Sequence, residues 1–438
     1  MKPKLKEALE SARETRALLI GQHILNQVPA LFREIFPGKP FRVVADTTTW
    51  KVAGDEVQKQ MERAGIACSS PFVFPESRHY TKYGNVEKLE EALRADQAIP
   101  VVVGSGTLND LTKLASSLAN RPYMCVATAA SMDGYTAFGA SITYQGAKQT
   151  FSCPAPEAVL ADIEIIRKAP AAMTASGYAD LFAKIVAGAD WILADALGNE
   201  PIEPKAWSIV QDGLKDALAD PRGAKEGEAS AITSLMEGLI LGGFAMQWSR
   251  TSRVASGAEH MLSHLWNMEH HTHHGETPSH GFQVGIATLA ISRLYEKVLQ
   301  TPLENLNVEA CCRQWPEWSE LETEIDQIFG NSDFRDIVWK HSNDKYLTRD
   351  ELAMQLEKLK SIWPELKTRL TGQLLPSQSV RDRLIAVGAP TEPEEIGISR
   401  ERMKDSFRKA WFIRSRFTVL DLAVRTGYLE QWLDEIYH

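Results

Sequence analysis

Cysteine is scarce in this sequence, and no two cysteines are spaced as CxxC. Only five occur among the 438 residues, and their number is odd. The missing CxxC pairs and the odd count fit reduced thiols in a cytoplasm. We therefore expect a cytoplasmic protein.

An excess of basic residues and a targeting segment are also lacking. The formal net charge of −9 argues against a nucleic-acid or membrane-surface partner, because either would need a basic field. The charged start, MKPKLKEALESARETR, has no apolar signal-peptide core. The most apolar run, SLMEGLILGGFAMQW, is short and carries Glu237, so it predicts a core helix rather than a membrane span.

The pattern of apolar residues changes once along the chain. From about residue 15 to 165, short β-rich runs such as FRVVAD and YMCVAT alternate with amphipathic helical runs. This alternation predicts a parallel sheet with helices on both faces, whereas the pattern after about residue 166 is helical almost throughout. We predict an α/β, Rossmann-like N-terminal domain (residues 1–166) and an all-α C-terminal domain (residues 167–438), two domains being usual at this length.

A glycine-containing turn follows one of the predicted strands. Val101–Val103 runs into Gly104-Ser105-Gly106-Thr107, and Asn109-Asp110 opens a helix. Glycines let a backbone approach a pyrophosphate, and a helix N-terminus offers amide donors and a favourable dipole. The spacing is not GxGxxG and a Walker lysine is absent, which argues against a P-loop NTPase. The alternative is an ordinary βα turn that needs glycine for its own geometry.

Two aspartates stand where strands of an open parallel sheet end. Asp46 closes an apolar strand, where it could accept hydrogen bonds from a ribose or simply cap the turn that follows. Asp133 lies in the polar turn 128–135 after a later strand, where it could touch a substrate or start the turn before Gly134.

Histidines are concentrated in one segment. Seven of the eleven lie between Gly257 and Gly281. His260 and His264 are four residues apart, which puts them on one face of a helix, and His280 stands before a further apolar helix. Asp180 lies in an apolar run, where an isolated carboxylate needs a partner. Imidazoles with a carboxylate and no cysteine are a ligand set for a divalent metal.

Each of these residues has a plainer interpretation as well. A lone His260 would be a hydrogen-bonded core residue, and Asp180 could cap a helix or pair with Lys184. The other histidines of the segment are predicted to form a solvated loop: His270, His271, His273 and His274.

Five blocks in this order resemble a known family: GSGTLNDLTKLAS, ATAASMDGYTAFGAS, SGYADLFAK, SRVASGAEHMLSHLW and SHGFQVGIAT. They are similar to those of sn-glycerol-1-phosphate dehydrogenases, especially the bacterial branch. That family is part of the iron-containing alcohol dehydrogenase and dehydroquinate synthase-like superfamily. The resemblance covers most of residues 15–300 and implies a dehydroquinate synthase-like fold.

The resemblance also implies roles for single residues. Asp180, His260 and His280 match the metal ligands, while His264 matches a substrate-facing histidine. With Asp180, His264 is expected to be catalytic, and Asp133 to contact the substrate. The implied dinucleotide contacts are Asp46, Gly106, Thr107, Leu108, Asn109, Asp110, Thr128, Ala129, Ala130 and Ser131.

Two positions depart from patterns in the superfamily. Ala137 stands where relatives often carry a serine that helps to bind the cofactor, which puts one hydrogen bond in doubt. Lys184 replaces a fourth metal ligand, a histidine, as in the three-ligand branch that uses zinc or nickel rather than iron.

The reaction implied is the reversible reduction of dihydroxyacetone phosphate to sn-glycerol 1-phosphate with NADH, and with NADPH as a further donor. A phosphate needs a cation, and Arg253 is the predicted partner because guanidinium binds phosphate bidentately, although it could equally be a surface or ion-paired arginine. The rival interpretations are a glycerol or other polyol dehydrogenase, a dehydroquinate synthase-like lyase, and a catalytically idle metal- or nucleotide-binding protein. The family also implies a homodimer.

Overall fold

The N-terminal part of the chain builds a parallel sheet, as predicted, and this sheet has six strands. A computed structural model describes residues 2–75, 81–144 and 147–437. The strands within these ranges are β1 (Ala17–Gly21), β2 (Phe41–Asp46), β3 (Phe72–Phe74), β4 (Ile99–Gly104), β5 (Met124–Ala127), β6 (Ala140–Tyr144), β7 (Ala147–Phe151) and β8 (Ala158–Asp162). The sheet has the order β1-β8-β5-β4-β2-β3, and its paired strands are all parallel.

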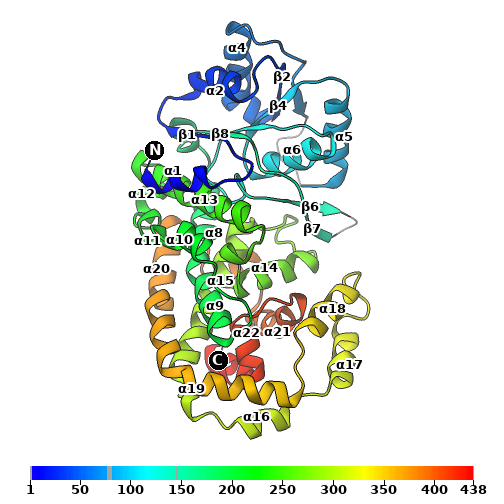
Figure 1. Cartoon of the computed structure of the whole chain (residues 1–438), viewed down its shortest axis with the longest axis vertical. Helices are drawn as coiled ribbons and strands as arrows, with labels where there is room; N and C mark the ends of the chain where they lie inside the picture. The colour runs from blue at the N-terminus through cyan, green and yellow to red at the C-terminus, as the bar shows by residue number, and fades with distance from the viewer. Residues whose placement is uncertain (1, 76–80, 145–146, 438) are drawn as a thin grey trace. The chain divides into compact units, whose positions relative to one another are not determined.

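Helices cover both faces of this sheet (Figure 1). The helical segments as far as residue 166 are α1 (Pro3–Glu10), η1 (Leu25–Gln27), α2 (Val28–Ile35), α3 (Thr47–Thr49), η2 (Trp50–Gly54), α4 (Asp55–Arg63), α5 (Tyr83–Arg94), α6 (Gly106–Leu118) and α7 (Ile163–Ile166). Phe32 of α2 and Val57 of α4 pack with Val43 and Val101 in one apolar cluster. Because side chains alternate across a strand, Val44 and Val102 point to the opposite face, and α6 packs against β4 and β2.

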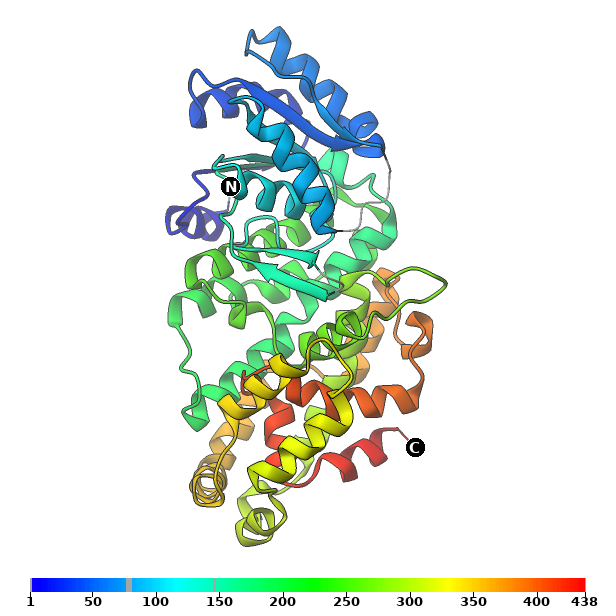
Figure 2. The same ribbon diagram turned by 90° about the vertical axis from the view of Figure 1, so that its right-hand side faces the viewer.

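Two features of this region were not predicted. β8, which lies between β1 and β5, was not recognised as a strand, and neither was the antiparallel β6–β7 hairpin. The hairpin is separate from the main sheet and packs against α6 and α5; its two teal arrows are visible in Figure 2.

The chain after residue 166 is helical, also as predicted. Its helical segments are α8 (Ala171–Phe182), α9 (Lys184–Leu197), α10 (Pro204–Gln211), α11 (Leu214–Ala217), α12 (Pro221–Glu226), α13 (Ala229–Ser249), η3 (Arg253–Ala255), α14 (Ala258–Met268), α15 (His280–Gln300), η4 (Leu303–Asn305), α16 (Val308–Gln314), α17 (Trp318–Phe329), α18 (Arg335–Lys345), α19 (Arg349–Gln373), α20 (Ser377–Val387), η5 (Pro393–Ile396), α21 (Arg400–Ala410), η6 (Trp411–Ile413), α22 (Val419–Arg425) and α23 (Leu429–Ile436).

The chain divides into two compact units. The first contains residues 1–181, 205–254 and 386–389, and the second residues 182–204, 255–385 and 390–438. Helices α10–α13 therefore pack with the sheet-bearing unit. The predicted boundary between residues 166 and 167 falls at the end of α7, and it stays a prediction.

One helix of the first unit is long and apolar enough to cross a membrane by length and composition alone. This is α13, whose most apolar window is 67% buried. Leu235, Met236 and Leu239 on this helix are fully buried. The burial fits the predicted core helix, although α13 is longer than the apolar run suggested.

Candidate functional site

The segments predicted to bind a dinucleotide lie at the carboxyl ends of neighbouring strands. β2 ends at Asp46, β4 at Gly104 and β5 at Ala127, and β4 lies between the other two. The backbone N–H of Thr128 donates to the carbonyl of Gly104 at 3.1 Å, which joins the turns after β4 and β5. In open α/β sheets this edge is where ligands bind. The location suits the predicted cofactor role, which stays a prediction for each residue.

Asp46 caps the helical turn that follows β2. Its Oδ1 accepts hydrogen bonds from the backbone N–H groups of Thr48 at 2.9 Å and Thr49 at 2.7 Å. The hydroxyl of Thr49 accepts a bond from the N–H of Asp46 in return, which completes a capping box. The plainer interpretation of Asp46 is thus correct. It does not exclude a ribose contact, because both capping bonds end on the same oxygen.

The turn after β5 is closely tied to α8 and α13. The N–H of Asp133 donates to Oδ2 of Asp180 at 3.1 Å, and Thr136 donates its hydroxyl proton to the carbonyl of Ile240 at 2.8 Å. Tyr135 donates to the carbonyl of Ala129 at 2.6 Å, and burial raises the pKa of its phenol. These hydrogen bonds fix the backbone around Asp133, and one of them ends on Asp180, which is predicted to bind metal.

Asp180 is fully buried in the last turn of α8. Because helix α8 begins nine positions earlier, at Ala171, Asp180 is not the helix N-cap that the sequence left open. Lys184, at the position of the missing fourth ligand, is also fully buried, as the first residue of α9.

The three candidate histidines lie together in the second unit. His260 and His264 share one face of α14, with ring centroids 6.2 Å apart, and His260 is 5.3 Å from the ring of His280. His280 is the first residue of α15, where the hydroxyl of Ser279 accepts from the N–H of Phe282 and caps the helix. The four-residue spacing therefore predicted the shared helix face correctly.

Glu259 selects which nitrogen of His260 can bind a metal. The buried Oε1 of Glu259 already accepts the N–H of Gly257 at 2.8 Å and lies 2.7 Å from Nδ1 of His260. A carboxylate oxygen is an acceptor, so Nδ1 carries the proton and donates it. Nε2 therefore keeps its lone pair, and a carboxylate behind a ligating imidazole is the usual outer support of a metal site.

Asp180, His260 and His280 form a group of candidate metal ligands. One potential ligand atom from each lies within 4.8 Å of the others. Among the described residues, these three form the group of His, Cys, Asp or Glu side chains that lie close enough to hold a metal ion together. A carboxylate with two imidazoles suits zinc, nickel or iron, and ligand type alone does not choose between them.

Replacing Glu259 with glutamine is expected to weaken zinc binding about 10–100-fold, the usual cost of losing an outer-shell carboxylate. A neutral amide accepts the Nδ1 proton less strongly and no longer imposes the tautomer on His260. The measurement is competition for zinc against a chromophoric chelator. Glu269→Gln, which alters a carboxylate paired with Arg402 at the end of the same helix, is the control. An unchanged zinc Kd in the Glu259 variant would contradict the orienting role.

Arg253 does not fit the surface interpretation that the sequence left open. Its side chain is fully buried at the start of η3, and its N–H donates to the hydroxyl of Thr251 at 3.2 Å. Burial of a guanidinium requires polar or anionic partners. Its role as the phosphate partner stays a prediction.

The prediction of a solvated histidine loop is wrong for His271. His270 and His274 are exposed, but His271 is only 6% exposed. Its Nδ1 lies 2.7 Å from Nη1 of Arg402, which can only donate, so Nε2 carries the proton and donates to the carbonyl of Ile396 at 2.6 Å. His271 is thus a neutral imidazole that joins this segment to η5 and α21 by hydrogen bonds.

Acidification is expected to destabilise the protein through His271. Burial is the main cause that lowers its pKa; the charges of Arg402 and His273 add to this, whereas Glu269 and the bond to Ile396 oppose it. The unfolded chain then takes up the proton first, so the free energy of unfolding falls as the pH drops below about 6.5 and is unaffected above it. Urea unfolding between pH 5 and 8 measures the slope.

The control for this prediction is the exposed neighbour. His271→Gln should reduce the acid dependence relative to His270→Gln, because glutamine keeps a donor and an acceptor without titrating. Equal slopes in the two variants would contradict the assignment.

Two of the buried cysteines are poor nucleophiles. Burial raises the pKa values of Cys125 and Cys153 to about 12, so both stay protonated near neutral pH.

Two buried residues that support the site were missed in the sequence. Glu259 could have been found as a carboxylate next to a candidate ligand in an apolar helix. Lys113, on the polar-looking helix after the glycine turn, had no local signal, because its partners lie more than twenty residues further along the chain.

The sequence is similar to those of a known enzyme family and its members. Residues 19–170 match the family described as iron-containing alcohol dehydrogenase. A glycerol-1-phosphate dehydrogenase [NAD(P)+] from Halalkalibacterium halodurans is 32% identical over 300 residues, which are 68% of this chain and 74% of that protein. One from Geobacillus thermodenitrificans is 27% identical over 92% of this chain and 91% of its own.

A solved structure shows the same fold at low identity. The sulfoacetaldehyde reductase from Bifidobacterium kashiwanohense in complex with NAD+ superposes with a TM-score of 0.60 at 14% identity, over 95% of this chain and 96% of its own. Together with the parallel sheet and the helical remainder, this establishes the dehydroquinate synthase-like fold. The chain belongs to the glycerol-1-phosphate dehydrogenase family, within the iron-containing alcohol dehydrogenases.

Proposed function

We propose that this protein is a metal-dependent NAD(P)H oxidoreductase that interconverts dihydroxyacetone phosphate and sn-glycerol 1-phosphate. The observation that carries the proposal is the group formed by Asp180, His260 and His280, in a chain whose relatives bear that enzyme's name. A glycerol dehydrogenase would share this group but would need no partner for a phosphate.

Asp180, His260 and His280 would hold one divalent ion, for which we propose zinc or nickel. The donor set fits: it offers one carboxylate and two imidazoles, and Glu259 leaves Nε2 of His260 as the ligand atom. Lys184 at the position of the fourth ligand favours these metals over iron. When bound, such an ion supplies Lewis-acid polarisation of the ketone oxygen.

The carboxyl edge of the sheet would bind the dinucleotide, which supplies the hydride. The first turn of α6, from Gly106 to Asp110, offers N–H groups and a positive dipole end to the pyrophosphate. The second turn, Thr128–Ser131, lines the same edge. Asp46 would accept the ribose hydroxyls and disfavour a 2′-phosphate, so we expect NADH to be used in preference to NADPH.

Three side chains would act on the substrate directly. Asp133 would accept hydrogen bonds from its hydroxyl groups, and Arg253 would bind its phosphate. His264, half-buried one helical turn after His260, would pass the proton to the alkoxide oxygen as the hydride arrives, because imidazole titrates near neutral pH.

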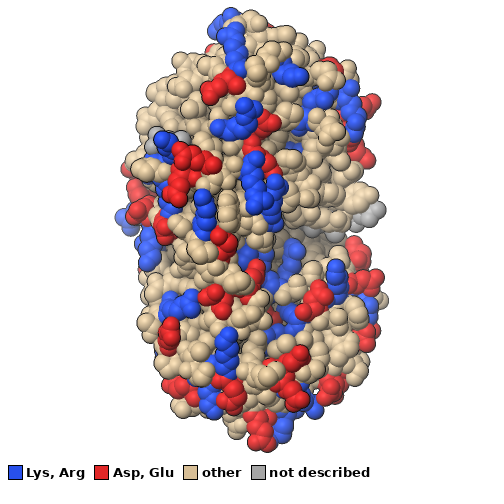
Figure 3. All heavy atoms as spheres, viewed as in Figure 1, with Lys and Arg blue, Asp and Glu red and all other residues tan. Residues whose placement is uncertain are grey.

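The remaining proposals concern location and assembly. On the face drawn in Figure 3, Lys and Arg side chains are interspersed with Asp and Glu, which does not favour a nucleic-acid or membrane partner. We propose a cytoplasmic homodimer, whose mass light scattering after size exclusion would measure.

The deciding experiment follows NADH oxidation with dihydroxyacetone phosphate, with dihydroxyacetone or with no ketone. Turnover is expected with the phosphorylated ketone, lost after verified metal removal and restored by zinc or nickel. The product should be inert to an enzyme that oxidises only sn-glycerol 3-phosphate. Oxidation with dihydroxyacetone alone would favour the polyol dehydrogenase, and unchanged turnover of the metal-free protein would exclude the Lewis-acid role.

A further inference from the structure

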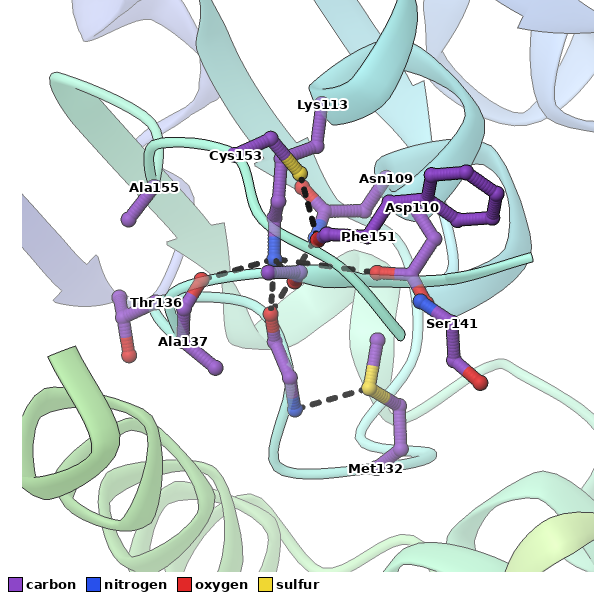
Figure 4. A network of polar contacts seen from close by, with 12 residues as sticks. Asn109, Asp110, Lys113, Met132, Thr136, Ala137, Ser141, Phe151, Cys153 and Ala155 are labelled. Atoms are coloured by element: carbon purple, nitrogen blue, oxygen red, sulfur yellow. Dashed lines mark hydrogen bonds and ion pairs between the residues drawn. The ribbon is translucent and has the colours of Figure 1, made fainter. Parts of the chain in front are cut away.

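Lys113 is a fully buried cation whose ammonium is occupied by backbone oxygens. Its Nζ donates to the carbonyls of Gly134 at 2.9 Å, Ala137 at 2.9 Å and Gly139 at 3.0 Å. An ammonium has three protons, so each is matched by one carbonyl. Figure 4 shows the side chain of Lys113 extending from α6 toward Ala137 and Asp110.

All three carbonyls belong to one irregular segment between β5 and β6. This segment, residues 132–139, is called the substrate turn below because it contains Asp133. It forms neither strand nor helix, and its internal bonds are few, such as that from the N–H of Gly134 to Sδ of Met132 at 2.8 Å. Besides α6, it is held by α8 through Asp133 and by α13 through Thr136. The three hydrogen bonds from Lys113 therefore fix the backbone of the substrate turn, which has no ladder of backbone hydrogen bonds of its own.

The same helix carries the predicted pyrophosphate segment at its first turn. Asp110 lies 3.7 Å from Nζ of Lys113, and its other carboxylate oxygen accepts the N–H of Ser141 at 3.2 Å. Asn109, one turn before Lys113, lies within 3.4 Å of the Gly134 carbonyl. Side chains of α6 thus contact the substrate turn from Gly134 to Gly139 and also Ser141 in β6, while the N-terminus of α6 lies at the carboxyl edge of the sheet.

Apolar packing would hold a turn without the cost of burying a charge. An ammonium that serves three carbonyls instead specifies one backbone conformation, because moving any carbonyl leaves a buried donor and a buried acceptor without a partner. The position of Asp133 is thereby coupled to the helix that would carry the cofactor.

We propose that Lys113 is a positioning residue that holds the substrate turn on α6 and so places Asp133 for the ketone. This rests on the proposed function. Lys113 touches neither substrate nor cofactor; it acts through the backbone of Gly134, Ala137 and Gly139.

The test compares Lys113→Met with wild type in steady-state kinetics and in binding. The KM for dihydroxyacetone phosphate should rise at least about tenfold and kcat should fall, because a small misplacement of a substrate group is costly. The Kd for NADH, from fluorescence titration, and the metal content should stay within about twofold. Lys113→Gln, which keeps two donors without the charge, should lie between the two.

The matched control is Lys345→Met. Lys345 is a second buried lysine, which donates to the carbonyl of Trp411 and pairs with Asp421 in the helical unit. Its loss should lower the melting temperature and leave KM unchanged. A merely structural Lys113 would behave in the same way, and that result would overturn the proposal.

Hydrogen exchange gives a readout that needs no turnover. In Lys113→Met, amides of residues 133–141 should exchange at least about tenfold faster, while those of β4 and β5 stay protected. Unchanged exchange in the substrate turn would overturn the proposal even if kinetics changed. If wild type reduces neither ketone, the proposed function fails and exchange alone decides whether Lys113 holds the turn. Should Lys113→Met not fold, Lys113→Gln carries both comparisons.

Discussion

Replacing Asp180 with alanine is expected to abolish metal occupancy and to lower turnover by at least about 10³-fold. Asp180 is the only carboxylate in the group of candidate ligands, so its loss leaves two neutral imidazoles for a doubly charged ion. Lewis-acid stabilisation of a developing alkoxide is worth several kcal/mol, and about 1.4 kcal/mol is a factor of ten in rate. Metal analysis of the purified variant and its single-turnover rate measure the two effects.

A second consequence of this change must be separated from the first. Oδ2 of Asp180 accepts the N–H of Asp133, so alanine also releases one end of the substrate turn. Asp180→Asn keeps an acceptor of the same shape and removes only the charge. We expect it to lose the metal as alanine does, while the turn keeps its hydrogen-exchange protection.

The control is a buried carboxylate outside the metal group. Asp421 accepts from Nε1 of Trp411 at 2.9 Å and pairs with Lys345 at 3.0 Å. Asp421→Ala should destabilise the protein yet keep one metal per chain. Wild-type metal content in Asp180→Ala would remove Asp180 from the ligand set and, with it, the proposed site.

Local periodicity predicted most of the sheet, because each early strand is an apolar run followed by a turn and an amphipathic helix. β8 escaped prediction, since AVLAD is short and its place between β1 and β5 is decided by pairing with strands far away in the sequence. In the β6–β7 hairpin, β6 alternates apolar and polar residues over only five positions, and β7, with the sequence AKQTF, does not alternate. The hairpin's stability comes from packing on α5 and α6, which no local window contains.

Some features of the candidate site could likewise be predicted from the sequence, and others could not. The spacing of His260 and His264 is a property of one helix, so the sequence alone showed it. The burial of Arg253 and of His271 could not be predicted in this way, because it depends on other segments that fold onto them. His271, for example, contacts Ile396 and Arg402. Lys113 is the clearest case, since a lysine on an amphipathic helix is usually exposed and only the substrate turn explains its burial.

Gly177→Ala is expected to be the most damaging small substitution in the first unit. Gly177 lies inside α8, where glycine costs about 1 kcal/mol relative to alanine, so a packing reason must keep it there. A Cβ at this position would lie 2.0 Å from the carbonyl oxygen of Ala130 and 3.1 Å from the carbonyl carbon of Ser131. Both are backbone atoms and cannot rotate away, so either α8 or the turn 128–131 must move.

We expect Gly177→Ala to lower the free energy of unfolding by about 3 kcal/mol, near the upper end for an overpacked site. The Kd for NADH should rise at least about tenfold, because the displaced turn is the one predicted to bind the dinucleotide and a misplacement of about 1 Å costs two orders of magnitude at a reacting site. Gly372→Ala is the matched control: it also lies in a helix, has open space at its Cβ and should stabilise the protein by about 0.5–1 kcal/mol. Wild-type stability and NADH affinity in Gly177→Ala would mean that α8 can withdraw from the turn at little cost.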